Sequence, residues 1–170
     1  MFRKPRFCSQ CGSALRDEVN DGRVRPVCPE CGHVMYLNPV PSVAAVLVKD
    51  HQILLVKRNI TPGKGKWSLP GGFMEAGETI AKSVCREVAE ETGVVCHSPR
   101  LLGAETVLGG FYGDVVVLCC GAEFANGPLA AGGDADEARF FDLDDLPEIA
   151  FAAHAQFIIQ YGRHDAARKD

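Results

Sequence analysis

Three glutamates lie within five positions of the segment REVAEETG, Arg86–Gly93. At about 100° per residue, Val84 and Val88 belong to an apolar helical stripe, and Glu87 and Glu91 fall close to it. An i,i+4 pair of like charges costs a few tenths of a kcal/mol in an exposed helix, and more where the carboxylates are partly buried. The segment alone allows two interpretations: a charged surface helix, or a set of carboxylates that holds a cation.

Arg86 is placed to reach Glu90 one turn later, which relieves one of these charges. The carboxylates of Glu87, Glu90 and Glu91 are then predicted to converge on one point. Oxygen ligands of this kind suit a hard divalent ion, Mg²⁺ or Mn²⁺.

A second candidate site consists of two C-x₂-C pairs separated by sixteen residues, Cys8/Cys11 and Cys28/Cys31. A glycine follows each pair, and glycine tolerates the positive φ of a tight turn. Four thiolates complete a tetrahedral, structural Zn²⁺ site. Two disulfides or free thiols are the alternative. Few apolar residues surround the pairs, so metal binding is expected to supply folding energy.

The chain reads as an α/β protein with four sections: a zinc ribbon (1–37), a linker at NPVP (38–41), a globular domain (42–165) and a tail (166–170). Within the domain we expect a hairpin from 43–48 and 53–58, and a helix over 79–92 that ends at Gly93. Strands are expected at 101–108, 114–124 and 139–143, with a flexible acidic loop over 126–138 and a final helix over 154–161. Strands bracketing helices predict a mixed sheet.

Composition narrows the function class. The chain has 170 residues, 46% of them hydrophobic, and a net charge of −4, which does not predict nucleic-acid binding. Basic residues in the ribbon keep that possibility open, although nucleic acid is the less favoured partner. The apolar runs are too short to span a bilayer, and no signal-peptide core follows the basic start. We therefore expect a cytoplasmic protein without a membrane partner, in a compartment that keeps the other four cysteines reduced.

From Gly72 to Val94 the chain reproduces, without a gap, the pattern G-x₅-E-x₇-R-E-U-x-E-E-x-G-U, where U is aliphatic. It thereby resembles the Nudix hydrolases, and LLVKRN, GKWSLPGG and EARFFDLDDLP extend the resemblance over about 42–160. The resemblance implies an α/β/α sandwich with a mixed sheet. The preceding ribbon is similar to the zinc-ribbon Nudix subgroup, which includes NADH pyrophosphatases and FAD- or ADP-ribose-cleaving enzymes.

The resemblance also implies roles for residues. Glu87, Glu90 and Glu91 would hold the catalytic Mg²⁺ or Mn²⁺, together with the carbonyl oxygen of Gly72. Arg86 would orient a glutamate, and Glu78 would brace the junction between loop and helix.

Family members take their general base either from the glutamate motif or from a downstream loop. Glu137 occupies the usual downstream position, and Asp134 and Asp136 are neighbours that could substitute. The alternative is that these residues form a solvated acidic turn.

Substrate contacts are predicted at Lys57 and Arg58, which follow a buried strand, although both are equally readable as surface charges. Phe73 and Tyr112 are candidates for stacking on a base, whereas Trp67 is expected to pack in the core.

The substrate is expected to be a nucleoside diphosphate linked to another group, with FAD or ADP-ribose favoured. The SQPWPFP motif of NADH pyrophosphatases is missing, and Tyr112 is similar to a tyrosine of dinucleoside polyphosphate enzymes. NADH, dinucleoside polyphosphates and oxidised nucleotides therefore stay as alternatives. A non-catalytic zinc-ribbon protein that binds nucleotide or RNA is the alternative from another class. A homodimer is possible.

Overall fold

The computed structural model describes residues 4–162, so the predicted tail and the last residues of the predicted domain lie outside the described part. By its internal contacts the chain divides into two compact units, Met1–Val40 with Leu108–Asp114, and Pro41–Val107 with Val115–Asp170. The two units are described separately.

The N-terminal unit contains a two-stranded antiparallel hairpin, β1 (Arg16–Asn20) and β2 (Arg23–Val27). Asp21 and Gly22 form its turn with φ of 50° and 72°, the pair of positive values that a type I′ turn requires. The cysteine pairs flank this hairpin along the chain, one before β1 and one after β2.

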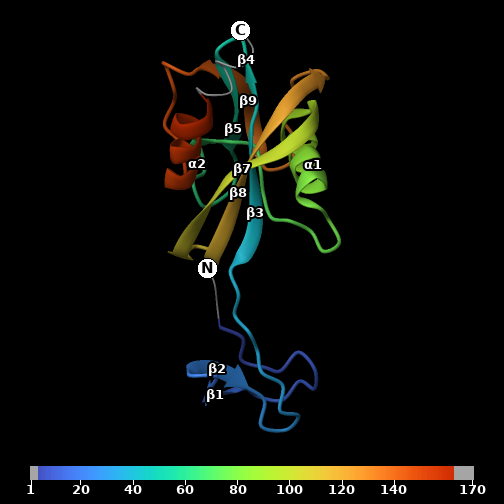
Figure 1. Cartoon of the computed structure of the whole chain (residues 1–170), viewed down its shortest axis with the longest axis vertical. Helices are drawn as coiled ribbons and strands as arrows, with labels where there is room; N and C mark the ends of the chain where they lie inside the picture. Colours follow the sequence, from blue (N-terminus) through green and yellow to red (C-terminus); the bar gives the residue numbers. More distant parts are fainter. Residues whose placement is uncertain (1–3, 163–170) are drawn as a thin grey trace. The chain divides into compact units, whose positions relative to one another are not determined.

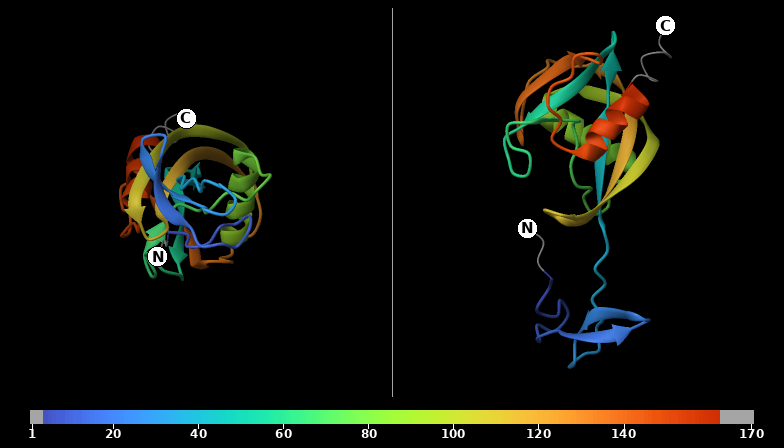
Figure 2. Two further views of the ribbon diagram at one scale, coloured as in Figure 1. Left: turned by 90° about the horizontal axis from the view of Figure 1, so that it is seen from below. Right: turned by 90° about the vertical axis from the view of Figure 1, so that its left-hand side faces the viewer.

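The larger unit begins with the strands β3 (Val40–Val46), β4 (Val48–Lys49), β5 (Gln52–Arg58) and β6 (Trp67–Ser68), followed by α1 (Ile80–Thr92). It continues with β7 (Val95–Gly110), β8 (Gly113–Asn126), β9 (Ala135–Asp142), α2 (Ala152–Phe157) and a π-helical turn over Ile158–Gly162. One sheet has the order β3-β8-β7, and a second joins β4, β5 and β6, with β9 antiparallel to β5. The helices α1 and α2 lie on opposite sides of the strands (Figure 1 and the left panel of Figure 2).

Side chains of β3 alternate between two hydrophobic cores. Ala44 and Val46 join the core that includes Phe157 from the C-terminal helix, whereas Val43 and Ala45 join the core that includes Val88 from α1 and its neighbours. A strand covered on both faces reads as a continuous apolar run, which explains the sequence SVAAVLV. This is the predicted α/β/α sandwich, and a parallel bridge between Trp67 and Ile149 makes the strand pairing mixed.

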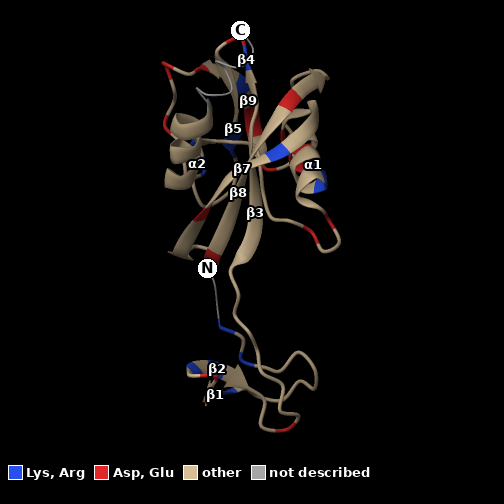
Figure 3. Cartoon of the chain, in the orientation of Figure 1, with Lys and Arg blue, Asp and Glu red and all other residues tan. Residues whose placement is uncertain are grey.

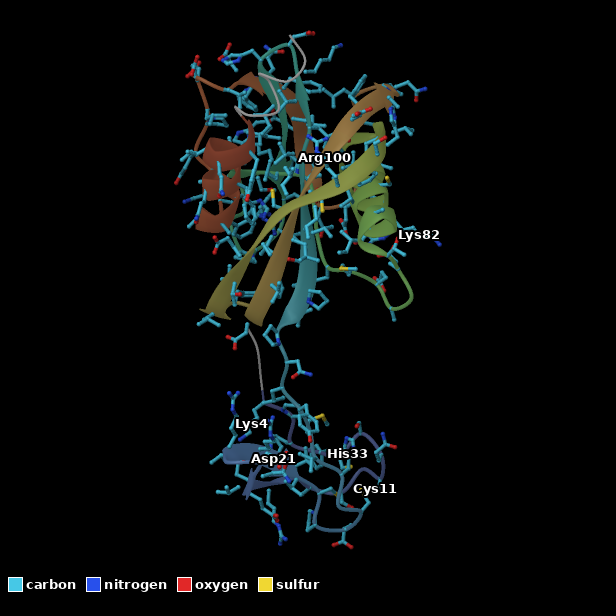
Figure 4. The ribbon with its side chains drawn as sticks, in the orientation of Figure 1. Lys4, Cys11, Asp21, His33, Lys82 and Arg100 are labelled. Carbon is cyan, nitrogen blue, oxygen red and sulfur yellow. The ribbon has the colours of Figure 1, made fainter. Side chains whose placement is uncertain are left out.

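Helix α1 agrees with the prediction at both ends. Thr79 caps its N-terminus by accepting a hydrogen bond from the amide of Lys82, and Gly93 ends it with φ of 69°. Lys82 lies on the outer side of the helix and points away from the strands (Figure 4).

Several boundaries differ from the prediction. Strand β7 (Val95–Gly110) has 16 residues and begins six residues before the strand expected at 101–108. Strand β3 already begins at Val40, because Pro41 is tolerated at the start of a strand. Strand β9 begins at Ala135, which shortens the predicted acidic loop. The last helix starts at Ala152, before the predicted residue 154, and changes to π-helix after Phe157.

The remaining loop after β8 is held in place. The amides of Ala130 and Gly132 donate to the carbonyl oxygens of Thr92 and Glu91, at 2.9 and 3.2 Å. These carbonyls belong to the last turn of α1 and have no partner within the helix. The loop therefore closes the C-terminus of α1.

Among the residues from 4 to 162, no helix combines the length and the apolar character needed to cross a bilayer.

Candidate active site

Glu91 lies on the buried face of α1 with only 6% of its surface exposed, next to the fully buried Val88. One carboxylate oxygen accepts a hydrogen bond from the amide of Gly71 at 2.9 Å. Burial, together with the charges of Glu87 and Asp134, raises the pKa of Glu91 to about 7, and the hydrogen bond from the Gly71 amide opposes this shift. The predicted helical phase is correct: this carboxylate emerges among the packing residues.

Two glycines before α1 have no space for a side chain, because the Glu87 carboxylate and the backbone of β3 lie against them. A Cβ atom on Gly72 would lie 2.6 Å from Oε1 of Glu87, and one on Gly71 would lie 2.1 Å from the carbonyl oxygen of Val43. The carbonyl oxygen of Gly72 accepts a hydrogen bond from the amide of Val43 at 2.9 Å. A carbonyl has two lone pairs, so this oxygen keeps one for a further partner.

Arg86 connects the helix to the preceding loop. It donates from Nε and Nη2 to the two carboxylate oxygens of Glu78, at 2.7 and 3.0 Å, and from Nη2 to the carbonyl oxygen of Phe73. The Arg86 guanidinium lowers the pKa of Glu78 to about 2. Figure 3 shows the acidic residues of the loop that leads into α1. Bidentate pairing of this kind fixes orientation as well as charge.

The same guanidinium compensates two of the three motif glutamates. Its Nη1 atom lies 2.7 Å from Oε1 of Glu87 and 3.2 Å from Oε2 of Glu90. Burial raises the pKa of Glu87, and Arg86 opposes this shift. Glu90 is the most exposed of the three, with 55% of its side chain accessible.

The predicted convergence on one point is not present. Within residues 4–162, the close-packed groups of possible metal ligands are the four ribbon cysteines and the exposed set His51, Asp142 and Asp144. Glu87 and Glu90 turn toward Arg86, whereas Glu91 turns toward Gly71. The donor set itself is all oxygen, and Glu87 and Glu91 are held in polar contacts on a packed helix face. This chemistry fits a hard divalent cation.

The downstream acids separate into two places. Glu137 lies in β9 opposite Lys57 of β5, and their side chains form an ion pair of 2.8 Å that lowers the pKa of Glu137. Asp134 lies on the loop, where its backbone carbonyl accepts from the amide of Asn59, and its charge raises the pKa of Glu91. The loop that carries Asp134 is thus bonded to the end of α1 through the Gly132 amide and the Glu91 carbonyl, whereas sequence position favours Glu137.

Arg58 is not the surface charge that the sequence also allowed, since only 8% of it is exposed. Its Nε donates to the carbonyl oxygen of Pro62 at 2.8 Å, and its guanidinium lies over the ring of Phe151, 4.9 Å from the centroid. Its charge lowers the pKa of Glu91 and also that of His154. No feature of the sequence indicated His154 or Phe151, because both reach this place only through the packing of α2.

The stacking candidates lie in different surroundings. Phe73 is 37% exposed next to the glycines. Tyr112 lies in the turn between β7 and β8, edge-on to Phe111, within the segment that groups with the N-terminal unit. Trp67 is buried and packs edge-on against Phe141, so its predicted core role is correct.

The cysteine pairs form two matching knuckles. The amides of Gly12 and Gly32 donate to the carbonyl oxygens of Cys8 and Cys28, and both glycines have positive φ. One Sγ atom from each of the four cysteines lies within 4.8 Å of the others. Figure 4 labels Cys11 from the first knuckle.

The sulfur separations test the fit of a metal. The Cys8–Cys31 and Cys11–Cys28 sulfurs are 3.6 and 3.4 Å apart. These distances are too long for disulfides, and they are close to the edge of about 3.8 Å of a tetrahedron with Zn–S bonds of about 2.3 Å. The residues therefore fit a structural Zn²⁺.

Comparison with known proteins identifies the class. Residues 38–161 match the family model described as NUDIX domain, and residues 6–37 match the one described as Nudix N-terminal. The solved structure of a NUDIX hydrolase from Nitrosomonas europaea superimposes with a TM-score of 0.79 at 28% identity, covering 94% of this chain and 93% of that one. The chain therefore belongs to the Nudix hydrolase family, among members with an N-terminal zinc ribbon.

Two members of the family are similar to the chain in sequence. The chain is 42% identical over 130 residues to an ADP-ribose pyrophosphatase of Methanocaldococcus jannaschii, with 76% of each covered. It is 31% identical over 153 residues to the NAD-capped RNA hydrolase NudC of Vibrio atlanticus, covering 88% of this chain but 54% of that protein. It thus spans about half the length of the NudC relative. The predicted enzyme class is confirmed: the chain is a pyrophosphohydrolase that cleaves the pyrophosphate linkage of nucleoside diphosphate derivatives.

Proposed function

We propose that the chain is a Mg²⁺- or Mn²⁺-dependent pyrophosphatase that prefers ADP-ribose. The main support is its 42% identity, over three quarters of both chains, to an ADP-ribose pyrophosphatase. FAD, which shares the ADP moiety, is the next substrate to test. The pyrophosphatase activity is common to the family, and the preference for ADP-ribose is proposed from the sequence identity and not from contacts to the adenosine or ribose groups.

The residues of α1 are assigned to the diphosphate. Glu87, Glu90 and Glu91, with the free lone pair of the Gly72 carbonyl, hold the divalent ion. When bound, it neutralises phosphate charge and lowers the pKa of a bound water. Arg86 keeps Glu87 and Glu90 oriented through the bonds it makes to both, and Glu78 keeps Arg86 in place.

For the proton acceptor we favour Asp134. Its charge acts on Glu91, it lies on a loop whose backbone is bonded to α1 and to Asn59, and it is exposed to solvent. Glu137 is engaged by Lys57, which makes its carboxylate a weaker base. In this proposal Lys57 and Arg58 supply positive charge near the phosphates, and Phe73 lies beside the glycines as a stacking surface.

A second candidate is the cleavage of an NAD cap on RNA or of NADH, because the NAD-capped RNA hydrolase NudC of Vibrio atlanticus is 31% identical. The missing SQPWPFP motif disfavours it. The ribbon carries acids beside its basic residues, with ion pairs Lys4–Asp17 and Arg16–Glu18, so it is a poor match for nucleic acid. We further propose that the ribbon binds zinc, and that the chain divides into the ribbon at 1–37 and the NUDIX domain at 42–165, with the linker between them. We also propose a cytoplasmic location and a homodimer.

The deciding experiment is a substrate panel with the full chain. ADP-ribose, FAD, NADH, diadenosine polyphosphates, nucleoside triphosphates and an NAD-capped RNA are incubated with Mg²⁺ and then Mn²⁺, and products are separated by chromatography. We expect the highest kcat/KM for ADP-ribose, with AMP and ribose 5-phosphate as products. A higher kcat/KM for NADH or the capped RNA would replace the proposal by the second candidate. The Glu91→Gln variant controls for contaminating hydrolases.

A further inference from the structure

Two cysteines outside the ribbon lie in contact between the motif helix α1 and strand β7. Cys85 lies on α1 and Cys96 on β7, with their sulfur atoms 3.6 Å apart. The thiol of Cys85 also lies 3.5 Å from the carbonyl oxygen of Cys96, which orients its sulfur toward that strand. A disulfide requires about 2.05 Å between the sulfurs, so they must approach by about 1.5 Å.

The other two cysteines of the domain provide a contrast. Cys119 and Cys120 are adjacent in β8, so their side chains point to opposite faces of the strand. Cys119 packs in the core that contains Phe157, and Cys120 in the core that contains Val88. Both are fully buried. Proximity in sequence therefore gives no pair, whereas two cysteines eleven positions apart meet.

We propose that Cys85 and Cys96 form a reversible disulfide when the protein meets a small-molecule disulfide. The bond is a modification site that fastens α1 to the first residues of β7. The segment it encloses, residues 86–95, contains Arg86 and all three motif glutamates. The proposal rests on the sulfur geometry and not on the substrate preference.

The reaction proceeds in two exchange steps. Cys85 is the more exposed partner, and Cys96 is only 5% exposed, so Cys85 meets the reagent first. Its thiolate attacks a sulfur of RSSR, which forms a Cys85–S–S–R mixed disulfide and releases RS⁻. Burial raises the pKa of the Cys96 thiol to about 12, so this thiol loses its proton only as it attacks Sγ of Cys85. The attack forms the internal disulfide and releases the second RS⁻, and the protons of the two protein thiols pass to the two released RS⁻ ions. Two protein thiols are oxidised and one RSSR is reduced to two thiols.

The zinc-loaded full chain is incubated with oxidised glutathione, its free thiols are alkylated, and its peptides are mapped by mass spectrometry. We expect a cross-linked peptide pair joining Cys85 to Cys96, lighter by two hydrogens and cleaved by dithiothreitol. In Cys96→Ser the mixed disulfide is expected to persist as one glutathionyl group on Cys85. In Cys85→Ser no cross-link forms, and in the matched control Cys120→Ser the Cys85–Cys96 link forms as in the wild type.

Circular dichroism shows whether each variant is folded before the exchange. A wild-type chain that carries a persistent glutathionyl group on Cys85 without the internal link would overturn the proposal. So would full alkylation of Cys85 and Cys96 after the same incubation, or links that involve Cys119 or Cys120 instead. Because the wild type itself is tested, these outcomes do not depend on the folding of a variant.

Discussion

At the scale of single residues, the site is determined by a conflict between packing and charge. Glu91 occupies a buried position of α1 next to Val88, and the backbone amide of Gly71 donates a hydrogen bond to its carboxylate. A carboxylate held there is unfavourable for the fold by itself. It becomes favourable when a cation binds, which is the physical reason to assign the position to function.

The first prediction concerns two of the glutamates. Glu91→Gln and Glu90→Gln are expected to lower kcat by about two orders of magnitude or more at saturating Mg²⁺, since each removes a charged oxygen ligand. Both variants should keep the wild-type circular dichroism spectrum. Lys82→Gln, on the outer side of the same helix, serves as the control with unchanged turnover. Near-wild-type rates for both glutamine variants would disprove the metal-site assignment.

The second prediction separates the two downstream acids. If Asp134 accepts the proton, Asp134→Asn is expected to lower kcat by roughly 10²-fold or more, because general base catalysis contributes about that much. Glu137→Gln breaks only the ion pair with Lys57 and is expected to change kcat by less than about 10-fold. Steady-state kinetics on ADP-ribose tests both variants together. The reverse order of effects would return the role to Glu137.

At the scale of elements, the loop before α1 and the helix form one unit through Arg86. Its guanidinium binds Glu78 and the Phe73 carbonyl on the loop side, and Glu87 and Glu90 on the helix side. Loss of any one contact leaves the others, but loss of the planar donor set affects all of them.

We therefore expect Arg86→Lys to raise the Mg²⁺ concentration needed for half-maximal activity by roughly 10–100-fold, as is usual for the loss of groups that orient metal ligands. Lysine keeps the charge but not the bidentate geometry. Titration of activity against Mg²⁺ concentration measures the shift. An unchanged Mg²⁺ dependence would show that charge alone, and not orientation, is needed at this position.

Helix α2 gives a prediction about pH. Burial, together with the positive charge of Arg58, lowers the pKa of His154 to about 4. The Nδ1 atom of His154 has no hydrogen-bond partner among the described residues. The unfolded chain binds the proton below about pH 6.5, whereas the folded chain binds it only near pH 4. The His154 contribution to stability therefore falls as the pH drops from 6.5 toward 4, by about 2 kcal/mol between pH 7 and 5.

Glu91 acts in the opposite direction over this range, because its folded pKa is raised and its contribution falls as the pH rises from 4.5 to 7. The test is therefore a comparison of His154→Leu with the wild type by urea unfolding at pH 7 and pH 5. We expect the variant to lose less stability than the wild type on acidification. Equal losses would mean that His154 is protonated in the folded protein at pH 5.

At the scale of the whole molecule, the two units are stabilised by different chemistry. The larger unit has two hydrophobic cores between its strands and helices, whereas the N-terminal unit exposes Phe7, Val19 and Val24 and holds its knuckles by hydrogen bonds and four thiols. A small unit of this kind depends on its metal.

We expect a strong chelator to make residues 1–37 sensitive to protease while the NUDIX domain stays resistant. A chain that begins at residue 38, just before β3, should lose thermal stability and keep measurable hydrolysis. Protease mapping and melting curves measure these changes. If the shortened chain is folded but inactive, the ribbon belongs to the active site.

The sequence by itself determined the elements with strong local signals. The spacing of the cysteines, the phase of the glutamates against Val84 and Val88, and the cap residues Thr79 and Gly93 depend only on neighbours along the chain. They predicted the ribbon knuckles and helix α1 with its ends. The family pattern also predicted the fold class.

Only the tertiary structure decided which distant groups meet. It placed the Gly71 amide on Glu91, paired Glu137 with Lys57, bonded the loop that carries Asp134 to the end of α1, and buried Arg58 beside Phe151. These contacts join segments tens of residues apart. Their partners are selected by the packing of both sheet faces, and no local spacing in the sequence encodes that packing.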